Sequence, residues 1–167
     1  TVRSIEDRIR LISDKIEEGK KDPFVHKIAA EVLGRKVGDQ WAVAEKDWEG
    51  EVVALFDFFR NNVRYTRDTE GLDTFQRARR TLEMGKADCD DAVITLGALL
   101  KSVGYPIRAT VVGVDSAEPN HVYLRVGLPP RAPTHWPALD ASVDRPPGWE
   151  ITKESGARVL YRKNFNL

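Results

Sequence analysis

Three side chains of this sequence could together perform nucleophilic chemistry: Cys89, His121 and Asp140. A cysteine reacts as its thiolate, a histidine can accept the thiol proton, and a carboxylate can hold the imidazole in one tautomer. Cys89 is the single cysteine among the 167 residues. The chain therefore contains the parts of a thiol-dependent acyl-transfer site, provided that its fold brings them together.

Cys89 is predicted to be the first residue of a buried helix. Between residues 89 and 103, apolar side chains occupy nearly all sides of the helical wheel, which is typical of a helix enclosed by other elements. Asp88 and Asp91 have the spacing of an acidic capping box, and a glycine and a proline soon after residue 103 end the helix.

Two opposing electrostatic effects act on the pKa of the Cys89 thiol. The free N–H groups and the positive end of a helix dipole favour a thiolate, whereas the carboxylates of Asp88, Asp90 and Asp91 raise the pKa of a neighbouring thiol. An imidazolium from His121 would outweigh them. With that partner, we expect the pKa of Cys89 to lie below the value of about 8.5 for a free thiol.

His121 and Asp140 are predicted to face each other across a hairpin. A turn-rich loop at 127–133 joins predicted strands at 121–126 and 134–139. A symmetric loop would place both side chains on one face of the sheet, with Cβ atoms about 4.5–5.5 Å apart. A slip of one residue would separate them.

Each of these roles has an alternative. A lone cysteine is often a small buried hydrophobe, so Cys89 could be structural. His135 is a rival base that would point to the other face of the sheet, and Asp140 could be a turn carboxylate with Asp144 as its neighbour.

Further residues could bind substrate. Trp136 and Tyr123 could line a cleft, although large aromatic side chains on strands are more often part of a core. Gln76 could donate a second hydrogen bond to an oxyanion.

The spacing of apolar residues predicts an α+β fold with a helix packed on an antiparallel sheet. Amphipathic helices are predicted at 3–19, ending at Gly19, at 23–34 and at 46–61, and a helix capped by Thr74 at 75–84. A loop is predicted at 69–73. The strands are a short segment at 63–66 and longer ones at 107–114, 121–126, 134–139 and 158–162.

The length predicts one compact domain, with a helical N-terminal extension at 1–61 packed on a core at 62–167. The N-terminal helices are either scaffold or a docking arm for a protein partner.

Composition excludes several classes of function. Basic and acidic residues number 26 each, so nothing predicts nucleic-acid binding, and no apolar run is long enough to span a membrane. A single cysteine excludes an intrachain disulfide and a cysteine-based zinc site. We expect no metal and no cofactor, and a soluble protein that is cytoplasmic or virion-associated.

Five segments resemble the transglutaminase-like superfamily in order and spacing. They are Val63–Tyr65, Asp88–Ala92, Gly104–Arg108, His121–Tyr123 and Trp136–Asp140. The resemblance implies a papain-like α+β fold, with the family's Cys, His and Asp triad at Cys89, His121 and Asp140.

The sequence is most similar to bacterial and phage-encoded members, many of them regarded as cysteine peptidases or amidases. The segment Pro146–Trp149 adds to the likeness to phage proteins. Two positions depart from related sequences: Asp90 replaces the aromatic residue that follows the cysteine in animal crosslinking enzymes, and Ala87 stands where bacterial relatives often have glycine.

The preferred interpretation is a cysteine peptidase or amidase that hydrolyses a peptide or amide bond through an acyl-cysteine intermediate. Hydrolysis is favoured over amine transfer because the aspartates around Cys89 are expected to form a hydrated rim. The alternatives are a non-catalytic protein-binding member, for example a phage structural or assembly protein, and a true glutamine transglutaminase.

Overall fold

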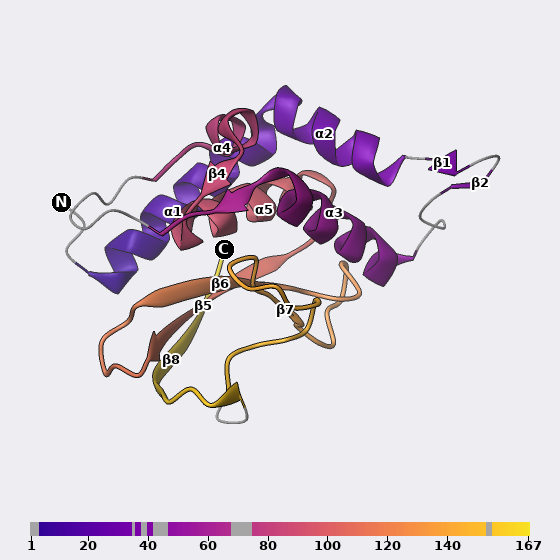
Figure 1. Ribbon diagram of the computed structural model, residues 1–167. Coiled ribbons are helices and arrows are strands. Elements are labelled where there is room, and N and C mark those ends of the chain that lie inside the picture. Colours follow the sequence, from indigo (N-terminus) through magenta and orange to yellow (C-terminus); the bar gives the residue numbers. More distant parts are fainter. Residues whose placement is uncertain (1–3, 35, 38–39, 42–46, 68–74, 153–154) are drawn as a thin grey trace.

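Helices cover one face of an antiparallel sheet in the computed structural model (Figure 1). The structure describes residues 4–34, 36–37, 40–41, 47–67, 75–152 and 155–167. The helices are α1 (Ile5–Lys21), α2 (Pro23–Leu33), α3 (Trp48–Asn62), α4 (Ala78–Met84) and α5 (Cys89–Ser102). This arrangement confirms the predicted α+β fold.

The main sheet has the strand order β7-β6-β5-β8, and every neighbouring pair is antiparallel. Its strands are β5 (Ile107–Val114), β6 (His121–Val126), β7 (Ala138–Leu139) and β8 (Val159–Asn166). Two smaller pairs lie outside it: β1 (Lys36–Val37) with β2 (Gln40–Trp41), antiparallel, and β3 (Arg64–Tyr65) with β4 (Lys86–Ala87), parallel.

Helix α5 lies at the centre of the core, as its apolar sequence predicts. All residues from Asp90 to Leu100 are buried. Helix α1 packs on α5 through its buried isoleucines, and the core extends without a break to α3 and to the sheet. The division into an extension at 1–61 and a core at 62–167 stays a prediction.

The prediction that Gly19 ends the first helix is wrong, because α1 continues through it to Lys21. Gly19 is buried, and a Cβ added to it would lie 2.8 Å from the Cβ of Ala98 and 2.9 Å from that of Ala78. Glycine is therefore required here by the close approach of three helices.

Other boundaries differ by a few residues. Helix α4 begins at Ala78 with Arg77 as its cap instead of beginning at residue 75, while Thr74 and the predicted loop at 69–73 lie outside the described residues. The predicted strand at 134–139 shortens to β7, because Pro137 cannot donate to a strand ladder. The last strand is longer than predicted and pairs with β5.

The predicted register of the hairpin is wrong by two residues. The structure pairs Leu124 with Leu139 and Leu128 with His135, whereas a symmetric loop would have paired Val122 with Leu139. Side chains alternate with a period of two, so a shift of two residues leaves every side chain on its predicted face.

Among the described residues, each helix is too short or too polar to cross a membrane.

The close packing at Gly19 generates a test of the fold. In an open helix, Gly→Ala stabilises by about 1 kcal/mol, but here the added methyl meets two rigid alanines, so we expect Gly19→Ala to lower the free energy of unfolding by about 1–3 kcal/mol. Urea denaturation measures the change.

The control is the double variant Gly19→Ala with Ala98→Gly, which removes one of the clashing methyl groups. Ala98→Gly should cost less stability in the Gly19→Ala background than in the parent. A Gly19→Ala protein as stable as the parent would contradict the steric explanation.

Candidate active site

Cys89 is the first residue of α5, as the sequence predicts. Asp88 is the helix cap, and its carboxylate accepts a hydrogen bond of 2.8 Å from the backbone N–H of Asp91. The Asp91 side chain reaches back to the N–H of Asp88, which completes the capping box. The cysteine is therefore held at a helix start, where free backbone N–H groups are found.

The chain before Cys89 is fixed by a short parallel ladder. Tyr65 of β3 lies beside Ala87 of β4, and the N–H of Thr66 donates to the carbonyl of Ala87 over 2.8 Å. Gly85 turns the chain from α4 into β4 with a φ of 68°, which a side chain would disfavour. Residues on both sides of the cysteine are thus anchored.

His121 and Asp140 meet directly, with 2.9 Å between Nε2 and Oδ2. His121 begins β6, and Asp140 follows the last residue of β7. They are diagonal neighbours across the hairpin, close enough for a long side chain to reach. The predicted contact is present although the predicted register is not.

Ser142 holds the carboxylate from its other oxygen. Its backbone N–H and its hydroxyl donate to Asp140 Oδ1 over 3.0 and 2.6 Å. Burial raises the pKa of Asp140, but the hydrogen bond and charge of His121 and the bonds from Ser142 outweigh it, so the net pKa lies below the usual value. Asp140 is therefore a buried carboxylate that stays ionised.

The rival residues lie elsewhere. His135 is more than half exposed and has Glu49 as its nearest carboxylate, 3.9 Å away. Asp144 is fully exposed and pairs with Arg60. The sequence offered two histidines and two carboxylates for the paired base and orienter, and in the structure His121 and Asp140 form this hydrogen bond.

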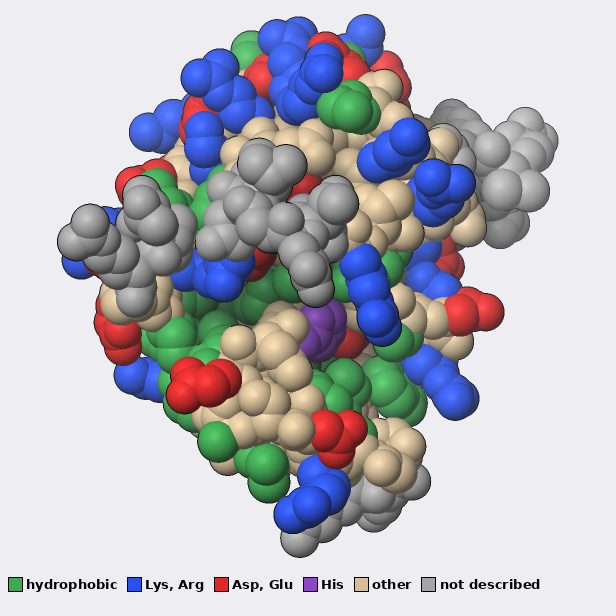
Figure 2. Space-filling view, turned by 60° about the vertical axis from the view of Figure 1, so that its left-hand side comes forward, with side chains coloured by type: hydrophobic (Ala, Val, Ile, Leu, Met, Phe, Trp, Pro, Cys, Tyr) green, Lys and Arg blue, Asp and Glu red, His purple; other side chains and the backbone are tan. Residues whose placement is uncertain are grey.

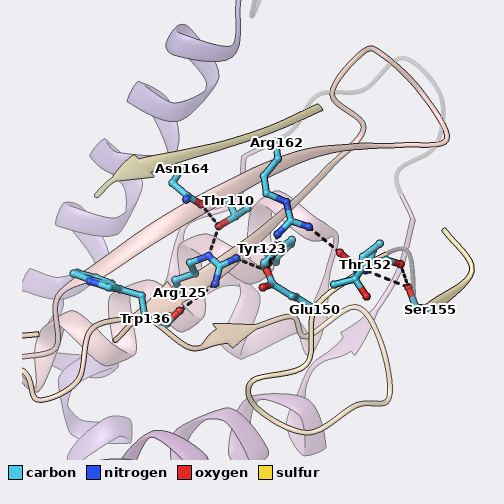
Figure 3. A network of polar contacts seen from close by, with 10 residues as sticks. Thr110, Tyr123, Arg125, Trp136, Glu150, Thr152, Ser155, Arg162 and Asn164 are labelled. Carbon is cyan, nitrogen blue, oxygen red and sulfur yellow. Dashed lines mark hydrogen bonds and ion pairs between the residues drawn. The ribbon is translucent and has the colours of Figure 1, made fainter. Parts of the chain in front are cut away.

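Trp136 does not line the cavity of about 800 Å³ beside Cys89, and Tyr123 lines only a separate, much smaller space with Cys89 and Asp140. Figure 3 shows Tyr123 in a polar network on β6, where its hydroxyl donates to Glu150 over 2.7 Å and Arg125 contacts the same carboxylate. The Trp136 ring lies 3.8 Å from the guanidinium of Arg108, and its carbonyl accepts from Arg125. A substrate-binding role for these two side chains stays a prediction.

Gln76 is also occupied elsewhere. Its backbone N–H and its side-chain amide donate to the two oxygens of Asp91 over 2.8 and 2.9 Å. Gln76 thus supports the capping box of α5 and does not line the large cavity beside Cys89, and its role as an oxyanion donor stays a prediction.

A cavity of about 800 Å³ opens beside Cys89 and His121, between α1 and the sheet. Figure 2 shows hydrophobic side chains recessed in a hollow on this side of the molecule. Polar members of its wall that the sequence did not single out include Ser4, Arg8, Arg67, Asn120 and Ser142. They come from segments far apart in the chain, so no local motif could have identified them.

Burial raises the pKa of the Cys89 thiol to about 12, and the charges of Asp90 and Asp88 add to the effect. The N–H of Val122 and the charge of Arg8 act in the opposite direction but do not compensate. Within the described residues, the sulfur has no direct hydrogen bond to His121. The expectation of a thiol with a lowered pKa is therefore wrong for the resting protein.

The expected hydrated acidic rim is also absent. Asp88, Asp90 and Asp91 are 5%, 4% and 2% exposed, so all three carboxylates are buried. Asp88 and Asp91 cap the helix, and Asp90 pairs with Arg8 of α1 over 3.2 Å. A preference for hydrolysis cannot rest on hydration of these side chains.

Comparisons with solved structures support the fold. A protein from Cytophaga hutchinsonii described as a candidate cysteine protease superposes with a TM-score of 0.54 at 18% identity, covering 84% of this chain and 42% of that one. A candidate protease from Parabacteroides distasonis gives a TM-score of 0.56 at 10% identity, covering 81% of this chain and 29% of that one. The present chain thus spans less than half of either structure.

A comparison with curated proteins found no match. A sequence profile described as the transglutaminase-like superfamily matches residues 35–141, which is more than half of the chain and includes Cys89, His121 and Asp140. The profile agrees with the residues that carried the resemblance, with the antiparallel sheet and with the cysteine at a helix start. The chain therefore belongs to the transglutaminase-like superfamily.

Proposed function

We propose that this chain is a cysteine peptidase or amidase, in which Cys89 is the nucleophile, His121 the base and Asp140 the residue that orients the base. The observation that carries the proposal is the hydrogen bond between His121 and Asp140 at the wall of the cavity that Cys89 also lines. A protein or peptide is the proposed substrate.

In the first step, His121 takes the thiol proton. Asp140 binds Nε2, which leaves Nδ1 as the nitrogen for that proton. The sulfur then attacks the carbonyl carbon and forms a C–S bond, while the carbonyl electrons move to oxygen. Free N–H groups at the start of α5 are the proposed donors to this oxyanion.

In the second step, the oxyanion collapses and the C–N bond breaks. The leaving amine takes the proton from His121, and an acyl-cysteine thioester remains. Water then gives a proton to His121 and attacks the thioester, which releases the carboxylic acid and returns the proton to the sulfur.

Because the thiol pKa is raised, the base has to remove the thiol proton before the sulfur can attack. At pH 7 the buried thiol is protonated, so a thiolate has to form by transfer to His121 as substrate binds. Transfer from the acyl-cysteine to an amine would require exclusion of water. A cavity of about 800 Å³ has ample room for water, which favours hydrolysis.

The raised pKa also favours a second candidate function. A cysteine that stays protonated and unreactive would suit a non-catalytic member of the family that uses the cavity, or the N-terminal helices, to bind a protein partner. A parent protein that shows no turnover dependent on Cys89 would support this alternative.

The triad is tested by substitution. Incubation with a denatured-protein peptide library, followed by mass spectrometry, should give new chain ends or deamidated side chains. Cys89→Ala should abolish them, and His121→Ala should reduce the rate about 10³-fold or more. Asp140→Asn should reduce it about 10²-fold or more while leaving the melting temperature near that of the parent.

His135→Ala is the matched control, because His135 lies away from the cavity, and it should retain parental activity. Loss of activity in His135→Ala but not in His121→Ala would show that the base is misassigned. Incorporation of an added fluorescent amine without hydrolysis products would identify a transferase instead.

The electrostatics of Cys89 are tested by alkylation with iodoacetamide. Because the pKa is raised to about 12, the labelling rate should rise about tenfold per pH unit from pH 7 to 10 without a plateau. Asp90→Asn removes a charge that raises this pKa, so labelling at pH 8 should become several-fold faster.

Asp144→Asn removes an exposed charge elsewhere and should not change the labelling rate. A plateau below pH 8 in the parent would mean that Cys89 and His121 already form an ion pair at rest, and the raised pKa would be refuted.

A further inference from the structure

We propose that one part of the cavity is a subsite for a bulky aliphatic side chain of the substrate, next to the reacting carbonyl. This part, the apolar arm, is formed by Ile5, Ile9 and Ile12 of α1 and by Val111 of β5. The inference rests on the proposed function, because it assigns the substrate preference of the same site.

The apolar arm has a floor and an open rim. Ile12 is fully buried, and Ile9 and Val111 are 8% and 6% exposed, so these three form a closed floor. Ile5 is partly exposed and forms the rim. A side chain entering past Ile5 would meet branched aliphatic groups of α1 and of β5.

The arm is continuous with the reacting groups. Cys89, His121 and Val122 line the same cavity as Ile9 and Val111. The N–H of Val122 acts on the sulfur and lowers its pKa, so the strand next to the arm also reaches the nucleophile. A substrate carbonyl at Cys89 would therefore have its neighbouring side chain within reach of the arm.

One ion pair at the cavity wall joins α1 to α5. Arg8 of α1 binds Asp90, the residue after the cysteine, over 3.2 Å. Because this pair links the helix that carries the isoleucines to the helix that carries the nucleophile, the wall is fixed relative to the sulfur. A charged substrate side chain in the arm would lose its hydration among isoleucines and valines, so an aliphatic one is favoured.

The test uses probes that react with Cys89 without turnover. Labelling rates are measured by mass spectrometry for iodoacetamide and for its N-(3-methylbutyl) derivative, whose branched chain can enter the arm. The parent should react about tenfold or more faster with the branched probe, relative to the rates of the two probes with free glutathione.

Two variants should abolish this preference by different means. Ile9→Trp fills the arm from its floor, and Ile5→Glu places a charge at its rim, at a helix start where an acidic residue is tolerated. The rate ratio should fall to about one in both. Leu11→Glu is the matched control, because Leu11 is exposed on the same helix, and it should keep the parental ratio. Melting temperatures identify a variant that fails to fold, and the other variant then decides.

The outcomes separate the subsite from the proposed function. A preserved ratio without any peptide hydrolysis would support the subsite and refute the peptidase. Hydrolysis without preference for a bulky aliphatic residue beside the scissile bond, together with a ratio near one, would refute the subsite and retain the peptidase. A ratio that survives in both Ile9→Trp and Ile5→Glu would also overturn the subsite.

Discussion

The start of α5 is the constraint on which the rest of the site depends. A buried helix needs partners for its first N–H groups, and Asp88 and Asp91 provide them with support from Gln76. The same carboxyl-rich turn places Cys89 at the first position of the helix, and burial with the neighbouring charges then keeps its thiol protonated. The requirement for a stable helix start thus opposes the formation of a thiolate, so the proposed chemistry needs a nearby base.

In the proposed mechanism the sheet supplies that base, under a second constraint. Asp140 is buried, which alone would raise its pKa, yet His121 and Ser142 saturate its oxygens and keep it ionised. An ionised carboxylate fixes the imidazole through Nε2 and leaves the other ring nitrogen for proton transfer. In the proposed mechanism the hairpin therefore contributes an oriented base, and its Val122, Leu124 and Leu139 pack in the same core as the helices.

The sequence predicted the features that depend on local pattern. It did not predict the features that depend on packing between segments far apart in the chain. The bounds of β5 and β6 and the first residue of α5 follow from β-branched runs and from a capping box, and all three were predicted. Gly19 resembled a helix end because nothing local indicates that three helices meet there. The hairpin register was wrong by two residues, but the period of a strand made that error harmless for His121 and Asp140. The protonation of the Cys89 thiol could not be predicted, because burial of the three aspartates beside it is a property of the assembled core.

Helix α1 packs on α5 and also forms part of the cavity wall. The family profile matches residues 35–141, so α1, which covers Ile5–Lys21, lies outside the matched segment. Its buried face packs on α5, which explains its amphipathic pattern as scaffold, yet Ile5 and Arg8 also form part of the cavity wall. The proposed reacting groups thus lie within the matched segment, while part of the cavity wall comes from outside it. Because Arg8 pairs with Asp90 beside the cysteine and the buried face of α1 packs on α5, substitutions at the partly exposed Ile5 are the ones expected to alter the wall with the least effect on Cys89.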